Sequence, residues 1–151
     1  MINPSDVNAI NYKTKTANEK EIYSHLMECD ERFVLLLSKR VNIAEYSGKL
    51  FKDSITFEAW LNTRLIGLVA AYFNNVTGYI TDVSVIEDYT KLGIATKLMN
   101  MCVEYAKSKQ FSEIKLEVNK DNAGALRLYD KFGFVHYDTK SDHLLMRLNG
   151  I

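Results

Sequence analysis

The chain has 151 residues, 47% of them hydrophobic, which is enough to bury one sizeable core, so residues 1–151 are expected to form a single domain. Nineteen basic residues balance nineteen acidic ones, so the net charge argues against nucleic acid or an anionic membrane as a partner. The N-terminal residues lack the basic and apolar regions of a secretion signal, and no apolar run is long enough to span a bilayer, which predicts a cytoplasmic protein.

The first half of the chain is predicted to form a strand, two helices and a meander of three strands. Apolar residues recur at helical spacing in Asn18–Glu28 and again in Ile43–Phe51. Polar turn residues separate the later apolar runs, as they do in hairpin connections. The strands expected in this half are Ile10–Lys15, Ser54–Trp60, Leu65–Phe73 and Gly78–Val85.

The second half alternates helices with strands. A helix is expected after Gly93, with Leu98, Cys102 and Tyr105 on one apolar face, and it should end near Ser108. The elements expected after it are a strand over Ile114–Val118, a helix that begins at Asn122, and strands over Phe134–Asp138 and His143–Leu148. This order predicts the α+β class, a mixed and mostly antiparallel sheet of about seven strands with flanking helices.

The turn Lys91–Thr96 joins a strand to the start of the helix after Gly93. The first N–H groups of a helix have no intrahelical partner and carry partial positive charge, so this turn can bind a pyrophosphate without a basic side chain. Neither Gly93 nor Lys97 fits the frame of an NTPase phosphate loop, and one glycine is too few for a dinucleotide fingerprint. A plain turn, in which the glycine only reverses the chain, stays the alternative.

A second signal lies in the segment Asn122–Phe134. Asn122 is suited to be an N-cap, Leu128 and Tyr129 continue a helical pattern, and Gly133 supplies a stop. With the turn before it, this segment resembles the two acetyl-coenzyme-A-binding motifs of the GNAT superfamily of N-acetyltransferases. Those motifs read Gln/Arg-x-x-Gly-x-Gly/Ala and, one strand later, Asn-x-x-Ala-x-x-Leu-Tyr-x-x-x-Gly-Phe.

The first motif departs from the family at one position. Thr90 stands where the family usually has Gln or Arg, so one polar or charged side chain that would bind the loop or the phosphates is missing. Lys91 or the hydroxyl of Thr96 is expected to compensate for it.

The resemblance implies that acetyl-CoA is the co-substrate. Its pantetheine arm would pair with backbone groups where the fourth and fifth strands separate, in the manner of an added strand, and its pyrophosphate would rest on the amides at the start of the next helix. The cofactor-binding residues expected on this basis are Val83, Ser84, Val85, Lys91, Leu92, Gly93, Ile94, Ala95, Thr96 and Asn122.

The resemblance also implies catalytic roles. Tyr129 matches the tyrosine that in relatives acts as general acid toward the coenzyme sulfur, whereas periodicity alone makes it a core tyrosine. Asp82 on the cleft-lining strand is the candidate base, and Glu58 on a neighbouring strand is the second candidate. For both carboxylates a solvated surface position is the alternative. A backbone N–H near Val83 is expected to stabilise the oxyanion.

The cysteines and histidines carry no such signal. Cys29 and Cys102 are isolated and read as small core residues. His25, His136 and His143 are scattered without the spacing of metal ligands, so no metal is expected.

The expected activity is direct transfer of an acetyl group to the primary amine of a small molecule. In the family the acceptor is set by the first two helices and the meander, here Cys29–Phe73, and a weak similarity of that region to acetyltransferases of surface-polysaccharide pathways favours an amino sugar. A protein N-terminus, a lysine or a small antibiotic amine stays open as acceptor. A non-catalytic acyl-CoA-binding module is the competing class, a pure interaction domain is a third, and a homodimer is left open.

Overall fold

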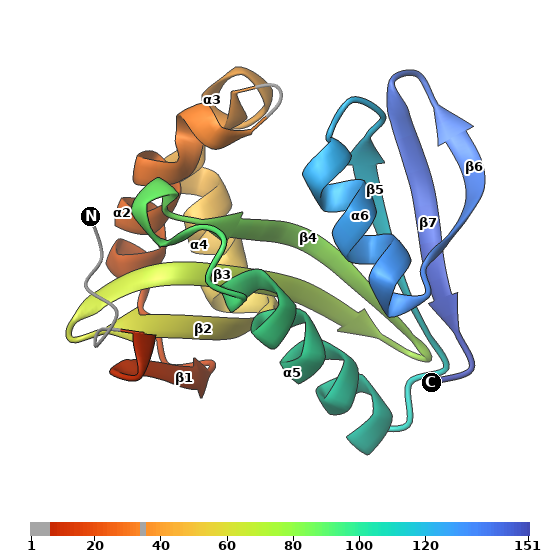
Figure 1. Ribbon diagram of the computed structural model, residues 1–151, viewed down its shortest axis with the longest axis horizontal. Helices are drawn as coiled ribbons and strands as arrows, with labels where there is room; N and C mark the ends of the chain where they lie inside the picture. The colour runs from red at the N-terminus through yellow and green to blue at the C-terminus, as the bar shows by residue number, and fades with distance from the viewer. Residues whose placement is uncertain (1–6, 34–35) are drawn as a thin grey trace.

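The computed structural model describes residues 7–33 and 36–151. Residues 1–6, considered above for a secretion signal, and residues 34–35 of the expected acceptor segment lie outside the described part. Seven strands form one sheet in the order β1-β2-β3-β4-β5-β7-β6 (Figure 1). Every neighbouring pair is antiparallel except β4 and β5, which run parallel. This mixed sheet with flanking helices confirms the predicted α+β class.

The strands agree with the expected ones to within one or two residues at most ends. They are β1 (Ile10–Thr14), β2 (Ile55–Leu61), β3 (Arg64–Asn74), β4 (Thr77–Val85), β5 (Glu113–Asn119), β6 (Val135–Lys140) and β7 (His143–Asn149). The sixth strand differs most: it extends two residues further, to Lys140, and it begins after Phe134, whose N–H donates to the carbonyl of Tyr129 at 3.0 Å in the turn that follows α6. The phenyl ring of Phe134 is instead buried in the core.

Helices cover both faces of the sheet. The helices are α2 (Glu19–Cys29), α3 (Leu37–Arg40), α4 (Ile43–Asp53), α5 (Ile94–Ser108) and α6 (Ala123–Phe132), with 3₁₀ turns η1 (Asp30–Arg32) and η2 (Glu87–Tyr89). Figure 1 shows α5 and α6 in front of the sheet and α2 and α4 behind it. The short helix α3 was not predicted, because four residues cannot show a helical period.

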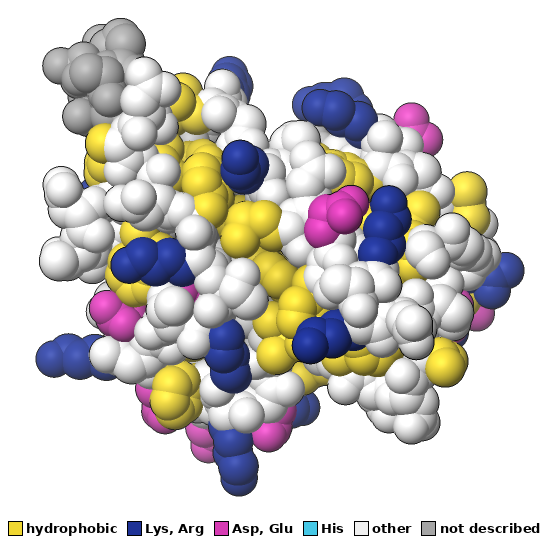
Figure 2. Space-filling model, turned by 90° about the horizontal axis from the view of Figure 1, so that it is seen from below, with side chains coloured by type: hydrophobic (Ala, Val, Ile, Leu, Met, Phe, Trp, Pro, Cys, Tyr) yellow, Lys and Arg dark blue, Asp and Glu magenta, His cyan; other side chains and the backbone are white. Residues whose placement is uncertain are grey.

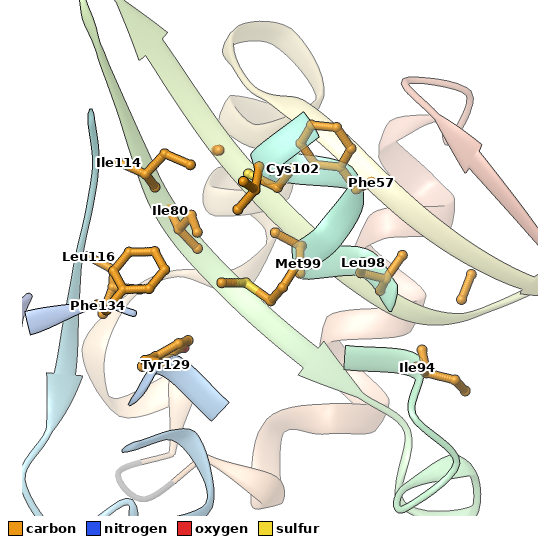
Figure 3. Close-up of a cluster of buried hydrophobic side chains, with 14 of the residues drawn as sticks. Phe57, Ile80, Ile94, Leu98, Met99, Cys102, Ile114, Leu116, Tyr129 and Phe134 are labelled. Atoms are coloured by element: carbon orange, nitrogen blue, oxygen red, sulfur yellow. The ribbon is translucent and has the colours of Figure 1, made fainter. Parts of the chain in front are cut away.

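Each face of the sheet has its own hydrophobic cluster. On the α5 side, Leu98, Met99 and Cys102 pack against Phe57 and the middle strands, as Figure 3 shows. On the other side, Ile22, Leu26 and Leu50 of α2 and α4 pack against Trp60 of β2 and against Leu65, Leu68 and Ala70 of β3. Burial of both faces explains why β3 reads as a nearly continuous apolar run instead of an alternating one.

Gly67 on β3 lets α5 approach the sheet closely. A Cβ atom at this position would lie 2.7 Å from Cγ2 of Ile94, the first residue of α5. A side chain there would push away the start of α5, whose free N–H groups are described below.

Asparagine side chains begin three of the helices. Asn18 and Glu21 form a reciprocal capping box at α2, Asn42 accepts from the N–H of Glu45 at α4, and Asn122 caps α6. These bonds satisfy N–H groups that would otherwise lack partners.

The surface carries charges of both signs. On the face shown in Figure 2, Lys and Arg side chains are spread singly among acidic and hydrophobic ones, as the balanced composition leads one to expect. Among the described helices, none combines the length and the apolar character that crossing a lipid bilayer requires.

Candidate functional site

A cleft opens where β4 and β5 separate. The two strands pair only over Thr77–Ile80 and Glu113–Leu116, after which both continue without pairing to each other. The cleft has a volume of about 240 Å³ and lies between the α3–α4 region on one side and β5 with α6 on the other. Figure 1 shows α3 and α6 on opposite sides of this separation. Divergence of two paired strands leaves backbone groups available to a ligand.

A β-bulge at Thr81 marks the point of divergence. Asp82 pairs with Ala70 and Ile80 pairs with Ala71, so Thr81 is the extra residue of β4. The phenol of Tyr46 on α4 lies 3.0 Å from the carbonyl oxygen and 2.9 Å from Oγ1 of Thr81. The bulge is therefore held from α4, and it sets the orientation of the residues that follow.

The backbone groups of Val83 and Val85 point toward the cleft, whereas those of Ser84 do not. The N–H of Ile86 donates to the carbonyl of Ile66 on β3, and backbone bonding alternates along an antiparallel strand. The N–H and C=O of Ser84 therefore face β3, and those of Val83 and Val85 face the opposite edge. This corrects the expectation that all three residues offer backbone groups to a pantetheine arm.

The start of α5 has the geometry expected of an anion site. Gly93, the N-cap, has φ of 81°, in the left-handed region, and Lys91 has φ of 66°. No side chain of the described residues caps this helix, so the N–H groups of Ile94, Ala95 and Thr96 are left for a ligand. Leu92 lies between the two left-handed residues and is half-buried.

Asn122 and Tyr129 reach the cleft from α6. The Oδ1 of Asn122 accepts from the N–H of Ala125 at 3.1 Å, so the cap uses its oxygen and leaves its amide NH₂ as a donor. Tyr129 is 6% exposed and lines the cleft from about two helical turns further along α6. Burial, and next to it the charge of Asp82, raises the pKa of the Tyr129 phenol, so the phenol holds its proton at neutral pH.

Asp82 is a buried carboxyl at the floor of the cleft. It is 4% exposed, and its Oδ2 accepts from the hydroxyl of Ser84 at 2.7 Å. Burial raises the pKa of Asp82 to about 6, against the smaller opposing effects of the Ser84 hydrogen bond and the Arg40 charge. A carboxyl that titrates near neutrality is suited to exchange protons with a substrate.

Glu58 does not lie in the cleft. Its side chain points to the α2 side of β2, is fully buried, and is not among the residues that line the cleft. The carboxylate accepts from Thr16, Ala17, Thr56 and Trp60 through five donor groups at 2.5–3.1 Å: two backbone N–H groups, two hydroxyls and an indole. With its lone pairs engaged in this way it joins β1 and β2 to the start of α2.

The cleft residues that the sequence analysis did not propose include Arg40 on α3, Tyr46 on α4 and His143 at the start of β7. His143 pairs with Asn119 at the end of β5, which brings it to the cleft. No spacing in the sequence identifies these residues, because they come from elements that meet only through the fold. Among the described residues, no group of three or more His, Cys, Asp or Glu side chains is placed to hold a metal ion.

The chain matches the model of the acetyltransferase (GNAT) family over residues 19–134. This range contains both motifs and the strands that form the cleft. The chain is 33% identical over 87 residues to N-alpha-acetyltransferase 30 of Schizosaccharomyces pombe, covering 54% of this chain and 58% of that protein. It is 32% identical over 97 residues to streptothricin acetyltransferase A of Bacillus subtilis, covering 63% of this chain and 53% of that protein. The chain thus spans a little more than half the length of these relatives.

Solved structures show the same fold. The PaiA N-acetyltransferase of Thermoplasma acidophilum, solved in complex with coenzyme A, aligns with a TM-score of 0.76 at 15% identity, covering 92% of this chain and 99% of that one. A structure described as a putative streptothricin acetyltransferase of Bacillus anthracis, in complex with acetyl coenzyme A, aligns with a TM-score of 0.56 at 27% identity, covering 64% of this chain and 62% of that one. With a family match over residues 19–134, the chain belongs to the GNAT family of acetyltransferases.

Proposed function

We propose that residues 1–151 act as one acetyl-CoA-dependent N-acetyltransferase domain that transfers an acetyl group directly to a primary amine, in the cytoplasm. The observation that carries this proposal is that Asp82 and Tyr129 line one cleft, where β4 and β5 diverge. A proton acceptor and a proton donor on either side of one site are what acyl transfer to an amine requires. All these groups come from one chain, so the proposal needs no second copy.

The chain offers two separate sets of binding groups for acetyl-CoA, which supplies the acetyl group as a thioester. The backbone groups of Val83 and Val85 face the cleft and suit the amide-bearing pantetheine arm. The uncapped N–H groups of Ile94–Thr96 suit the pyrophosphate. Asn122 keeps an amide donor at the cleft wall. These features fit the coenzyme without a cluster of basic side chains.

The proton transfers can be assigned to two side chains. As the bond forms between the amine nitrogen and the acetyl carbon, the amine loses a proton, which Asp82 accepts. As the bond between the acetyl carbon and sulfur breaks, the sulfur takes a proton from Tyr129. In this proposal the N–H of Val83 stabilises the negative charge on the acetyl oxygen. Return of one proton from Asp82 to Tyr129 through solvent restores both groups.

The acceptor that we propose is a small polar amine, with an amino sugar as the favoured class. Polar groups of Arg40, Thr81, Asn119 and His143 line the cleft together with Asp82, and they suit a molecule with several hydroxyl groups. The name of the streptothricin acetyltransferase relative also indicates a small-molecule acceptor.

A protein N-terminus is the second candidate acceptor. It is favoured by the similarity to N-alpha-acetyltransferase 30, which by its name acts on the α-amino groups of proteins. The two acceptor classes differ in size, so a panel of amines that contains both amino sugars and short peptides separates them.

The test of the function is release of free thiol from acetyl-CoA in the presence of that panel. We expect release that depends on the acceptor, and a kcat roughly ten- to a thousandfold lower in Tyr129→Phe with nearly unchanged acetyl-CoA affinity, because the variant loses only proton donation. A protein that is stabilised against heat by coenzyme A but releases no thiol with any acceptor would be a binding module instead. An unchanged kcat in Tyr129→Phe, with chemistry rate-limiting, removes Tyr129 from the mechanism.

Replacing Gly93 by valine is expected to weaken coenzyme A binding about tenfold. A β-branched residue in the left-handed region is strained by about 1–2 kcal/mol. Open space surrounds the position, so strain and not collision is the cause. Titration calorimetry with coenzyme A measures the affinity. Gly48→Ala, within α4, is the matched control, and equal affinity of Gly93→Val and wild type would exclude the turn from the site.

A further inference from the structure

Three buried polar side chains form a chain that runs from the cleft to α2. The Oγ of Ser84 lies 2.7 Å from Oδ2 of Asp82 and 2.9 Å from Nε2 of His25. Asp82, Ser84 and His25 are 4%, 6% and 1% exposed. The proposed acetyl transfer uses Asp82 directly, and it assigns nothing to the side chains of Ser84 and His25.

The hydrogen bonds of His25 determine which ring nitrogen carries the proton. Its Nδ1 lies 2.9 Å from the carbonyl oxygen of Leu65, which can only accept. Burial lowers the pKa of His25 to about 4, so the ring is neutral at physiological pH. A neutral ring with its proton on Nδ1 has an unprotonated Nε2, which can only accept a hydrogen bond.

The hydroxyl of Ser84 has one proton and two neighbours that require it. When Asp82 is ionised, Ser84 donates to Asp82, and Nε2 of His25 then faces an oxygen lone pair at 2.9 Å, with the thiol of Cys29 at 3.7 Å as a weak donor. When Asp82 is protonated, its own O–H donates to Ser84, and Ser84 donates to His25. In this second arrangement every donor and acceptor of the chain has a strong partner, whereas in the first arrangement Nε2 of His25 has only the weak thiol donor.

We propose that His25 is a positioning residue which, through the Ser84 hydroxyl, stabilises the protonated form of Asp82 and so makes this carboxylate a stronger base toward the acceptor amine. Proton uptake by Asp82 is then coupled to reversal of one hydroxyl group. The role of Asp82 as base rests on the proposed function, whereas the coupling between Asp82 and His25 does not.

Other groups also act on the two ends of this chain. They are Arg40, Tyr46 and Tyr129 near Asp82, and Cys29, Glu28 and Arg64 near His25. The Arg40 charge favours the ionised carboxyl, and the two phenols stay neutral because burial raises the pKa of each. The variants below keep all six groups, so their effects are constant in the comparison.

The test compares His25→Asn with His25→Gln. Asparagine can donate to the Leu65 carbonyl but does not reach Ser84, whereas the longer glutamine places an oxygen near the position of Nε2. We expect His25→Asn to move the acidic limb of the pH profile of kcat/KM to lower pH by about 0.5 to 1 unit, the equivalent of one hydrogen bond. His25→Gln should keep the limb close to its wild-type position, which a purely structural role of the imidazole does not predict.

Making His25→Asn in a Ser84→Ala background tests whether the effect passes through the Ser84 hydroxyl. Without the hydroxyl, His25→Asn should no longer move the limb, although it will still alter stability. An acidic limb at the same pH in wild type and His25→Asn overturns the inference, as does a limb that moves equally with and without the Ser84 hydroxyl.

A measurement without turnover separates this inference from the proposed function. Titration of the Asp82 carboxyl by ¹³C NMR should show the same downward shift in His25→Asn. If the NMR titration of Asp82 shifts but the acidic limb of kcat/KM does not shift with it, the coupling between Asp82 and His25 is supported and the role of Asp82 as base is refuted. Should His25→Asn not fold, ¹⁵N NMR of the wild type decides: the Nε2 signal of His25 must change at the Asp82 midpoint, and an unchanged signal overturns the coupling.

Discussion

Replacing Asp82 by asparagine is expected to lower kcat for acetyl transfer by roughly 10²- to 10⁴-fold, the usual contribution of a positioned general base. The amide has nearly the same shape and can still bond to Ser84, but it cannot accept the proton of the amine. Steady-state rates measured with saturating acetyl-CoA report the loss. The acidic limb of the pH profile, expected near pH 6 because burial raises the pKa of Asp82 to about 6, should disappear in the variant.

Stability measurements supply the control for this variant. Since the folded-state pKa of Asp82 lies above its ordinary value of 3.8, ionisation of this carboxyl reduces folding stability as the pH rises from about 4 to about 6. The asparagine variant does not incur this loss, so at pH 8 it should unfold at the same urea concentration as wild type or at a higher one. A full rate of transfer by the folded variant would show that another group, or water alone, takes the proton.

Replacing Glu58 by alanine is expected to lower the free energy of unfolding by about 3–5 kcal/mol, because each buried donor left without an acceptor costs about 1–3 kcal/mol. Two of the donors are backbone N–H groups, of Thr16 and Ala17, and a third is the Trp60 indole. They fix the connection from β1 to α2. Urea unfolding followed by fluorescence of the single tryptophan measures the change.

Two comparisons separate the structural role of Glu58 from a catalytic one. Glu104→Gln, at a side chain that is 71% exposed on α5, should change stability by well under 1 kcal/mol. Glu58→Gln keeps one carbonyl oxygen, so it should lose less stability than Glu58→Ala and keep the wild-type kcat once folded. A stable Glu58→Ala protein with greatly reduced kcat would return Glu58 to the list of candidate bases.

Periodicity predicted the elements of this fold because each is long enough to show its period. The apolar face of α5 and the alternation in β5 are examples. It did not predict α3, which has a single turn. The sequence left Glu58 as a candidate base or a solvated carboxylate, and not as a buried structural one, because it does not show that helices cover both faces of β2.

The candidate site was only partly accessible to sequence reasoning. The Gly93 turn and the α6 motif lie within short segments, so their residues can be identified in order. The contact between His25 and Ser84 joins residues 59 positions apart, and no local pattern reveals it. The orientation of the Ser84 backbone depends on the register of β3 against β4, which only the paired strands define.

The short parallel pairing between β4 and β5 has a consequence for the molecule as a whole. In the part of the chain that the structure describes, β4 and β5 pair over four residue pairs, and the bonds from Ser112 to the Val76 carbonyl and from Thr77 to Glu113 lie at the same end of this pairing. A sheet divided in this way has its weakest joint next to its reactive groups. A molecule that binds along the free edge of β4 would add hydrogen bonds between the two parts of the sheet. Its binding would therefore stabilise their association, and loss of that association would weaken its binding.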